Sequence, residues 1–156
     1  MDIRIRPCRM EDIDRIAAME AAIFSEPWTK TGFLETLSET AHVFLVAEDQ
    51  ENLCAYGILY CNSDEGEIPT IAVSEEARGR GLGKRLLSRM MQEAEKRGVE
   101  HVYLEVRKSN LQAQRLYQTC GFSLVGQRKG FYHKPDEDAF CLLYTSDAAD
   151  DLIGVD

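Results

Sequence analysis

Short apolar runs and alternating hydrophobic and polar residues recur along the chain, and both patterns predict β-strands. In residues 101–107, Val102, Leu104 and Val106 would face one side of a sheet, and the intervening polar residues the other. The polar stretch from Asp49 to Asn52 separates two apolar runs and predicts a hairpin turn. The predicted strands are residues 3–5, 43–47, 53–61, 66–73, 101–107 and 122–127, with a last strand beginning near Asp138.

Four segments instead repeat their apolar residues at helical spacing. The clearest is the segment from Lys84 to Arg97, whose apolar positions recur every four residues and which Gly98 ends as a C-cap. An earlier helix opens at Met10, a second spans residues 29–38, and a fourth runs to about Thr119 from a cap at Ser109 or Asn110. This order of strands and helices predicts an α/β protein with a mixed sheet in three layers.

The chain has 156 residues, 44% of them hydrophobic and 29% charged, which is typical of one soluble globular domain. No apolar run approaches the length of a membrane span. The charged, alternating start of the chain is unlike a signal peptide, so we expect a cytoplasmic protein without a membrane partner.

The formal net charge of −9 argues against a nucleic-acid partner. It is compatible either with a basic substrate or with solubility alone. The five cysteines contain no CxxC pair, which favours reduced, small apolar residues, although Cys120 stays open as a catalytic thiol. His42, His101 and His133 form no cluster in the sequence, so no metal site is predicted.

The end of the chain differs from the rest. The segment from Cys141 to Asp150 is what a DNA string resembling a transposase adapter used in shotgun sequencing would encode. We therefore expect a domain at residues 1–140 and a non-native tail at 141–156, whose apolar start could finish the last strand by chance. The genomic read across this point would test the hypothesis.

The segment from Arg78 to Gly83 carries the most information about function. It lies between the apolar run Ile71-Ala72-Val73 and a helix, and a strand that turns through glycines into a helix start binds anions through free backbone N–H groups. A P-loop would need a glycine five residues before Gly83 and Ser or Thr in place of Arg85. A Rossmann loop would need a glycine where Lys84 stands.

The remaining spacing, Arg78-x-x-Gly81-x-Gly83, resembles the pyrophosphate loop of the GCN5-related N-acetyltransferases (GNAT), which bind acetyl-coenzyme A. The segment from Asn110 to Phe122, with its Leu116-Tyr117 and Gly121-Phe122 pairs, extends the resemblance over nearly all of residues 1–140. It implies a three-layer α/β/α GNAT fold, whose central mixed, mostly antiparallel sheet is splayed between strands four and five.

Three further stretches resemble the ribosomal-protein-alanine N-acetyltransferase (RimI) family: residues 24–28, residues 104–110 and residues 137–139. This implies direct acetyl transfer to the N-terminal alanine of a small-subunit ribosomal protein, by a monomer or weak dimer. Ser25-Glu26 stands as an insertion, and Gly130-Phe131-Tyr132 replaces a tyrosine pair, so the acceptor is less fixed than the cofactor. A small-molecule amine acetyltransferase and a catalytically silent acetyl-CoA-binding module remain the alternatives.

The resemblance also implies roles for particular residues. Glu105 would accept the proton of the amine and Tyr117 would protonate the departing thiolate. Phe24, Trp28 and Tyr132 would border the acceptor. Without the resemblance, an outward acid paired with Arg107 or a lysine, and a core tyrosine packed by its ring, are the better explanations of the first two. The residues expected to hold acetyl-CoA are Ile71, Ala72, Val73, Arg78, Gly79, Arg80, Gly81, Leu82, Gly83, Lys84 and Asn110.

Overall fold

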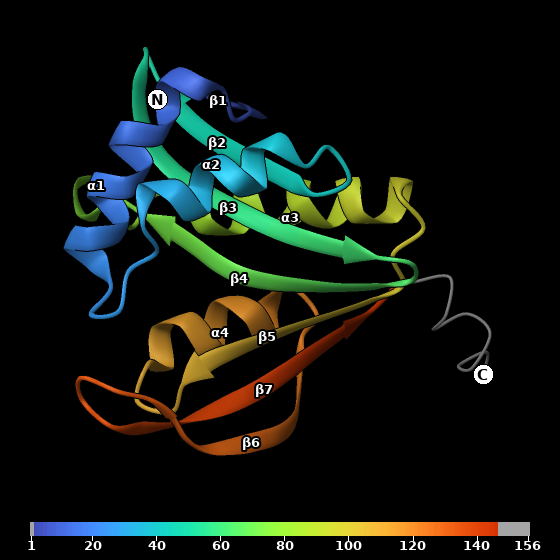
Figure 1. Cartoon of the computed structure of the whole chain (residues 1–156). Coiled ribbons are helices and arrows are strands. Elements are labelled where there is room, and N and C mark those ends of the chain that lie inside the picture. The colour runs from blue at the N-terminus through green and yellow to red at the C-terminus, as the bar shows by residue number, and fades with distance from the viewer. Residues whose placement is uncertain (1, 147–156) are drawn as a thin grey trace.

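A seven-stranded mixed sheet forms the centre of the computed structural model, which describes residues 2–146 (Figure 1). The strand order is β1-β2-β3-β4-β5-β7-β6, and β4 and β5 are the parallel pair. The mixed, mostly antiparallel sheet predicted from the sequence is thereby confirmed. The strands are β1 (Ile3–Pro7), β2 (Val43–Asp49), β3 (Asn52–Asn62), β4 (Glu65–Val73), β5 (His101–Arg107), β6 (Ser123–Tyr132) and β7 (Glu137–Thr145).

Helices cover both faces of this sheet. In Figure 1, α1 and α2 lie in front of β2 to β4, whereas α3 and α4 lie behind the sheet. This is the predicted three-layer arrangement. None of the helices in residues 2–146 has the length and apolar character needed to cross a membrane. The helices are α1 (Ile13–Ile23), α2 (Lys30–Ser38), α3 (Leu82–Lys96) and α4 (Leu111–Thr119), with short 3-10 helices η1 (Met10–Asp12) and η2 (Glu75–Ala77).

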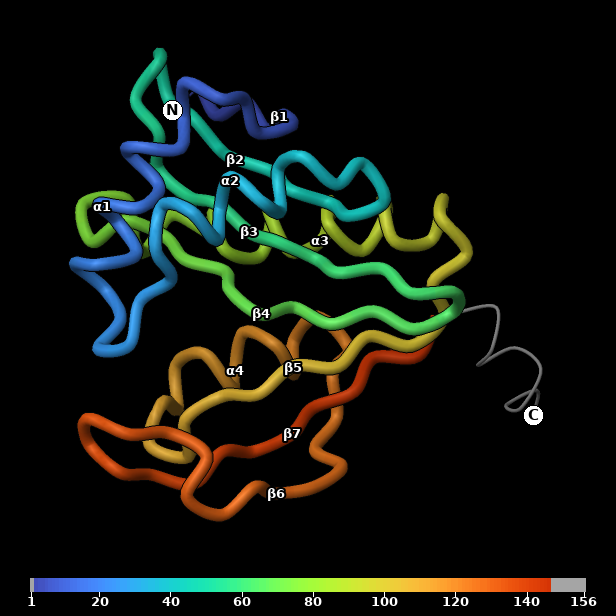
Figure 2. The backbone as a smooth tube through the Cα atoms, viewed as in Figure 1, coloured from blue at the N-terminus to red at the C-terminus, as the bar shows by residue number. Residues whose placement is uncertain are grey.

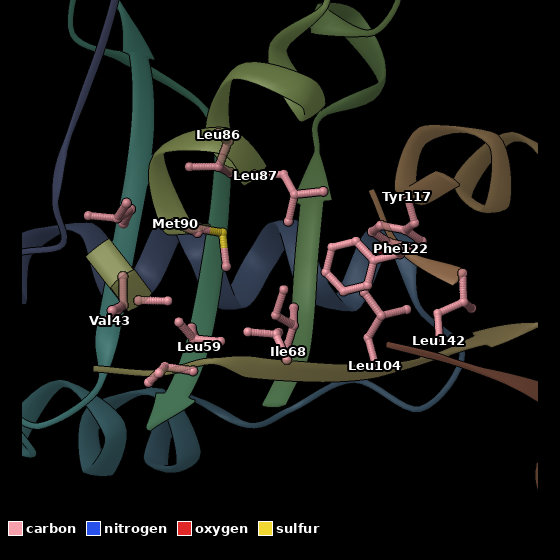
Figure 3. Packing of buried hydrophobic residues seen from close by; sticks show 14 of the residues in the cluster. Val43, Leu59, Ile68, Leu86, Leu87, Met90, Leu104, Tyr117, Phe122 and Leu142 are labelled. Carbon is pink, nitrogen blue, oxygen red and sulfur yellow. The ribbon is translucent and has the colours of Figure 1, made fainter. Parts of the chain in front are cut away.

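Two main apolar clusters, of three in the described residues, hold the layers together. The larger lies between the sheet and the helices α3 and α4, and Figure 3 shows Leu86, Leu87 and Met90 of α3 pointing toward Leu59 and its neighbours. Burying a side chain of this size contributes roughly 1.5–3 kcal/mol. The smaller cluster lies under α1 and α2, where Phe33 is fully buried. The four-residue repeat along α3 is therefore the face that the helix buries.

The sheet separates between β4 and β5. These strands pair only through Glu65, Gly66 and Glu67 of β4, so the rest of β4 has no strand partner on that side among residues 2–146. Figure 2 shows the two strands close at one end and apart at the other. The expected splay between strands four and five is therefore present, and it leaves backbone N–H and C=O groups of β4 facing an opening.

Among the boundaries that differ from the predicted ones, those of the last two strands matter most for the sheet. The sixth strand continues to Tyr132 rather than stopping at Gln127, because Asp138 accepts hydrogen bonds from Gln127 and from the backbone of Gly130, which has a φ of 65°. The last strand includes residues 141–145, which pair with β5. The first residues of the predicted tail, 141–145, thus form part of β7. Residues 147–156 lie outside the part of the chain that the structure describes.

Candidate functional site

The glycine turn joins β4 to α3 in left-handed backbone conformations. Gly79 and Gly81 have φ angles of 83° and 75°, and a Cβ atom at either would meet nothing within 4 Å. Gly81 is the N-cap of α3 and offers no side chain to the first-turn N–H groups. These groups and the helix dipole are therefore directed toward open space, as an anion site requires.

Packing fixes this turn against the opening of the sheet. A Cβ at Gly83 would approach the Leu116 side chain of α4 to 3.1 Å and that of Val73 to 3.7 Å. The missing side chain thus lets α3 begin close to the end of β4. Leu82 is buried, so only its backbone can face a ligand. The free edge of β4, which includes Ile71, Ala72 and Val73, is joined to the turn by the short helix η2.

The basic residues of the turn are partly engaged by the protein. Arg78 donates from Nε to the Val73 carbonyl at 3.2 Å, and Arg80 lies 3.9 Å from the Asp49 carboxylate. Lys84 borders a small outer hollow beside α3. Asn110 caps α4, its side-chain oxygen accepting from the Ala113 N–H at 3.1 Å. This leaves its NH2 group as the part that could donate to a ligand.

Glu105 stands on β5, on the far side of the opening. The alternation of β5 buries Val102, Leu104 and Val106 and leaves Glu105 half-buried on the other face. Burial raises the pKa of its carboxyl group. The charge of Arg128, whose Nε lies 3.9 Å from the Glu105 carboxylate, lowers this pKa, and the charge of Glu67 raises it further. A carboxylate with a raised pKa is a better proton acceptor than an exposed one.

Tyr117 of α4 lies in the core beside the opening. Its side chain is 8% exposed, its ring packs on Phe122 at 5.8 Å, and its hydroxyl has no hydrogen-bond partner within the described chain. Burial raises its pKa, and the nearby Tyr132 adds to the effect. Burial, with Glu105 as the next cause, raises the pKa of Tyr132 to about 12. Tyr132 is therefore a neighbour of both predicted proton-transfer residues.

A groove of about 1120 Å³ extends from Glu105 along the face that carries α1 and α2. Five carboxylates line it, against one arginine, Arg128. Trp28 also lines it, stacked on Tyr60 with 6.1 Å between the ring centres. Phe24 and Tyr132, the other predicted acceptor contacts, are not among its lining residues. The carboxylates belong to Glu35, Glu39, Glu65, Glu67 and Glu105.

Cys120 and a group of possible metal ligands are two other candidate sites, and neither is among the residues that line this groove. Cys120 ends α4, and burial raises the pKa of its thiol, which favours the unreactive protonated form. Among residues 2–146, Asp64, Glu100 and His101 bring possible ligand atoms within 4.8 Å of one another. This exposed group lies where β4 and β5 meet, away from Glu105, and nothing else marks it as a site.

Sequence reasoning missed the role of Glu20. It lies on α1 and is 3% exposed, yet helical spacing alone does not distinguish it from the apolar residues beside it. Its carboxyl group accepts from the Tyr56 hydroxyl at 2.7 Å, the Thr70 hydroxyl at 2.9 Å and the Trp28 N–H at 3.1 Å. Glu20 thereby ties the segment before α2 to the sheet beneath the groove.

Comparison with known proteins gives a consistent result. A family model described as "Acetyltransferase (GNAT) family" matches residues 13–122. The [ribosomal protein bS18]-alanine N-acetyltransferase of Escherichia coli K12 is 33% identical over 137 residues, covering 85% of this chain and 92% of its own. The N-alpha-acetyltransferase RimI of Mycobacterium tuberculosis is 35% identical, covering 84% and 85%. The crystal structure of the E. coli ribosomal-protein-S18-alanine N-acetyltransferase superposes with a TM-score of 0.85 at 27% identity, covering 92% of this chain and 94% of the other.

Proposed function

The chain belongs to the acetyltransferase (GNAT) family, and we propose that it transfers the acetyl group of acetyl-CoA to the N-terminal alanine of ribosomal protein bS18. The observation that carries this proposal is the opening between β4 and β5. One wall is the unpaired edge of β4, which leads into the glycine turn, and the other wall carries Glu105. A donor and an acceptor can therefore reach the same point from opposite sides.

Acetyl-CoA would occupy the side of the opening that ends in the glycine turn. Its pyrophosphate would accept from the backbone N–H groups of residues 79–84, where Gly79 and Gly81 leave space. Its pantetheine arm would lie along the free edge of β4 as an added strand does. The N–H of Val73 would then donate to the thioester oxygen as charge develops on it.

Glu105 and Tyr117 would carry the two protons of the reaction. A substrate α-ammonium has a pKa near ~8, so a carboxylate base suffices to remove its proton near neutral pH. The free amine attacks the thioester carbon, a C–N bond forms, the C–S bond breaks, and the nitrogen releases its second proton, which replaces the one that Tyr117 donates. Tyr117, whose hydroxyl has no other partner in the described chain, would then protonate the leaving thiolate.

The groove favours a polypeptide acceptor over a small amine. Its volume of about 1120 Å³ exceeds the roughly 300–1,000 Å³ that drug-sized ligands fill. Its carboxylates outnumber its single arginine, which suits a cationic N-terminal segment. Two relatives that match over 86% and 92% of their own length, from Haemophilus ducreyi and Escherichia coli, are named [ribosomal protein bS18]-alanine N-acetyltransferase.

The proposal is tested by following free thiol release from acetyl-CoA. The acceptors are peptides of equal length that begin Ala-Arg, Ser, Met or Lys, with spermidine as a small-amine comparison. We expect turnover with the Ala-Arg peptide and a kcat/KM at least ~10-fold lower with the other starts. Preference for spermidine would assign the enzyme to small amines. Acetyl-CoA binding without turnover on any amine would make it a silent binding module.

A pair of glycine variants tests the position of acetyl-CoA. Gly81 and Gly98 lie at opposite ends of α3, both in the left-handed region with free space around them. Alanine at either should therefore cost a similar ~1–2 kcal/mol of stability. We expect only Gly81→Ala to weaken coenzyme A binding, by about 10-fold or more, because its methyl group enters the anion cradle. Calorimetric titration measures this, and equal weakening by both variants would contradict it.

A further inference from the structure

Two loops that are distant in sequence are joined beside Tyr132. One loop connects α1 to α2, and the other is the turn between β6 and β7; Figure 2 shows them close together at the open end of the sheet. The junction consists of the side chains of Ser25, Glu26 and Arg107 and the backbone of His133, and is called the clasp below.

Arg107 forms the first half of the clasp. One terminal nitrogen, Nη2, donates to the Ser25 hydroxyl at 3.3 Å and to the His133 carbonyl at 3.0 Å. The other, Nη1, donates to the Pro135 carbonyl at 3.0 Å and to the Glu137 carboxylate at 3.1 Å. Because the guanidinium is planar, the directions of these hydrogen bonds are fixed. Arg107 therefore determines the relative position of the two loops as well as attracting them.

Glu26 forms the second half. Its carboxylate accepts from the His133 N–H at 2.9 Å, although the two residues are 107 positions apart. Ser25 and Glu26 are the same two residues that depart from the resemblance as an insertion. Glu26 therefore binds the β6–β7 turn directly, whereas Ser25 is linked to that turn through Arg107. They also lie directly before Pro27 and Trp28 in the sequence, and Trp28 lines the groove.

Tyr132 lies at the centre of this junction. The guanidinium carbon of Arg107 is 4.5 Å from the centre of its ring, a cation–π contact. The residue after it, His133, is the one held by Glu26. Tyr132 is also the electrostatic neighbour of both Glu105 and Tyr117. The clasp thus holds a tyrosine that neighbours both predicted proton-transfer residues.

We propose that Arg107 and Glu26 are positioning residues, whose clasp holds Tyr132 and the α1–α2 loop in place around the N-terminus of the acceptor polypeptide. The identity of the acceptor in this proposal rests on the proposed function, whereas the arrangement of the two loops does not. Because none of the clasp's hydrogen bonds within residues 2–146 reaches the glycine turn or the free edge of β4, it should affect the acceptor and not acetyl-CoA.

Two substitutions at one exposed residue test the clasp without endangering the fold. Glu26→Ala removes the acceptor for the His133 N–H, whereas Glu26→Gln keeps an acceptor oxygen and removes only the charge. We expect Glu26→Ala to raise KM for the Ala-Arg peptide by about 3–10-fold with KM for acetyl-CoA unchanged. Glu26→Gln should stay within about 2-fold of wild type. Arg107→Lys, which keeps the charge but not the fork, should raise the same KM by about 10-fold or more.

The other outcomes would overturn the proposal. An equal rise of KM in Glu26→Ala and Glu26→Gln would mean that Glu26 attracts the peptide by charge. A parallel rise of KM for acetyl-CoA would indicate a general disturbance of the fold.

Amide hydrogen exchange separates this result from that of the proposed function. In Glu26→Ala, and not in Glu26→Gln, segments 23–28 and 131–137 should exchange at least ~5-fold faster. If the wild type acetylates no N-terminal peptide, the acceptor assignment fails. The exchange rates of these two segments then test by themselves whether the clasp holds the loops together. Unchanged exchange in both segments would overturn it.

Discussion

Replacing Glu105 by glutamine is expected to lower kcat for peptide acetylation by about 10²–10⁴-fold, while the affinity for acetyl-CoA stays unchanged. Glutamine keeps the size of the side chain but cannot accept the ammonium proton. The position is half-buried on the face of β5 opposite the core, so the fold should tolerate the change. Steady-state thiol release and calorimetric titration of coenzyme A measure the two effects.

The dependence of kcat/KM on pH gives this prediction a second readout. An acceptor amine with a pKa near ~8 makes log kcat/KM fall with slope 1 below that pH. Burial raises the pKa of Glu105 above its usual 4.5. As the pH falls below this raised pKa, Glu105 becomes protonated and log kcat/KM should fall with slope 2. This steeper part of the profile, called the second limb below, should begin at a pH above 4.5. In Glu105→Gln the slope should stay at 1 throughout. A slope of 2 in that variant would contradict the assignment.

Two neighbours of Glu105 provide matched controls. Glu67 raises the pKa of Glu105 and Arg128 lowers it. Glu67→Gln should therefore move the second limb to lower pH, and Arg128→Gln should move it to higher pH. Both variants should keep kcat near neutral pH within about 3-fold of wild type, because neither removes the base. Tyr117→Phe should lower kcat but leave the second limb in place.

The parts of the site that depend on neighbouring residues could be predicted from the sequence. The turn from Arg78 to Gly83 follows from glycine spacing between a strand and a helix, and in the structure Gly79 and Gly81 have left-handed backbone conformations. The outward direction of Glu105 follows from alternation along β5. Asn110, one of two proposed caps, begins α4. Each of these depends on residues within one turn or strand.

The parts that depend on distant residues could not be predicted. Arg107 was expected on the face of Glu105, but its partners lie 26 to 82 positions away in two loops. The length of β6 depends on Asp138 of the next strand. The burial of Glu20 depends on donors 8, 36 and 50 positions away. A periodic pattern carries no information about such pairings, because it reports only which face of an element is apolar.

Removal of the Glu20 carboxyl group is expected to have the largest effect on stability. Glu20→Ala should lower the free energy of unfolding by about 3–5 kcal/mol, a large share of the roughly 5–15 kcal/mol typical of a domain. Its loss leaves the hydroxyls of Tyr56 and Thr70 and the Trp28 N–H without an acceptor, and the side chains of Tyr56 and Thr70 are buried. Urea unfolding should show a lower midpoint with an unchanged slope.

Two variants on the same helix distinguish this cause from a general effect of changing α1. Asp14→Ala breaks an exposed ion pair with Lys30 and should stay within about 0.5 kcal/mol of wild type. In Glu20→Gln the remaining side-chain oxygen can still accept from Tyr56 and Thr70, which share Oε1 in the wild type. The NH2 group then faces the Trp28 N–H, and because both are donors this hydrogen bond is lost. This substitution should therefore cost about 1–2 kcal/mol.

The same pair of substitutions separates stability from acceptor binding. Both Glu20→Ala and Glu20→Gln weaken the bond to the Trp28 N–H, which holds the segment before α2 against the sheet. Both should therefore raise KM for the peptide by similar factors, although only Glu20→Ala is strongly destabilised. A KM that instead follows the loss of stability would mean that Glu20 supports the core alone. A shared rise in KM would assign to one buried carboxyl group both the stability of the α1 layer and the position of Trp28 in the groove.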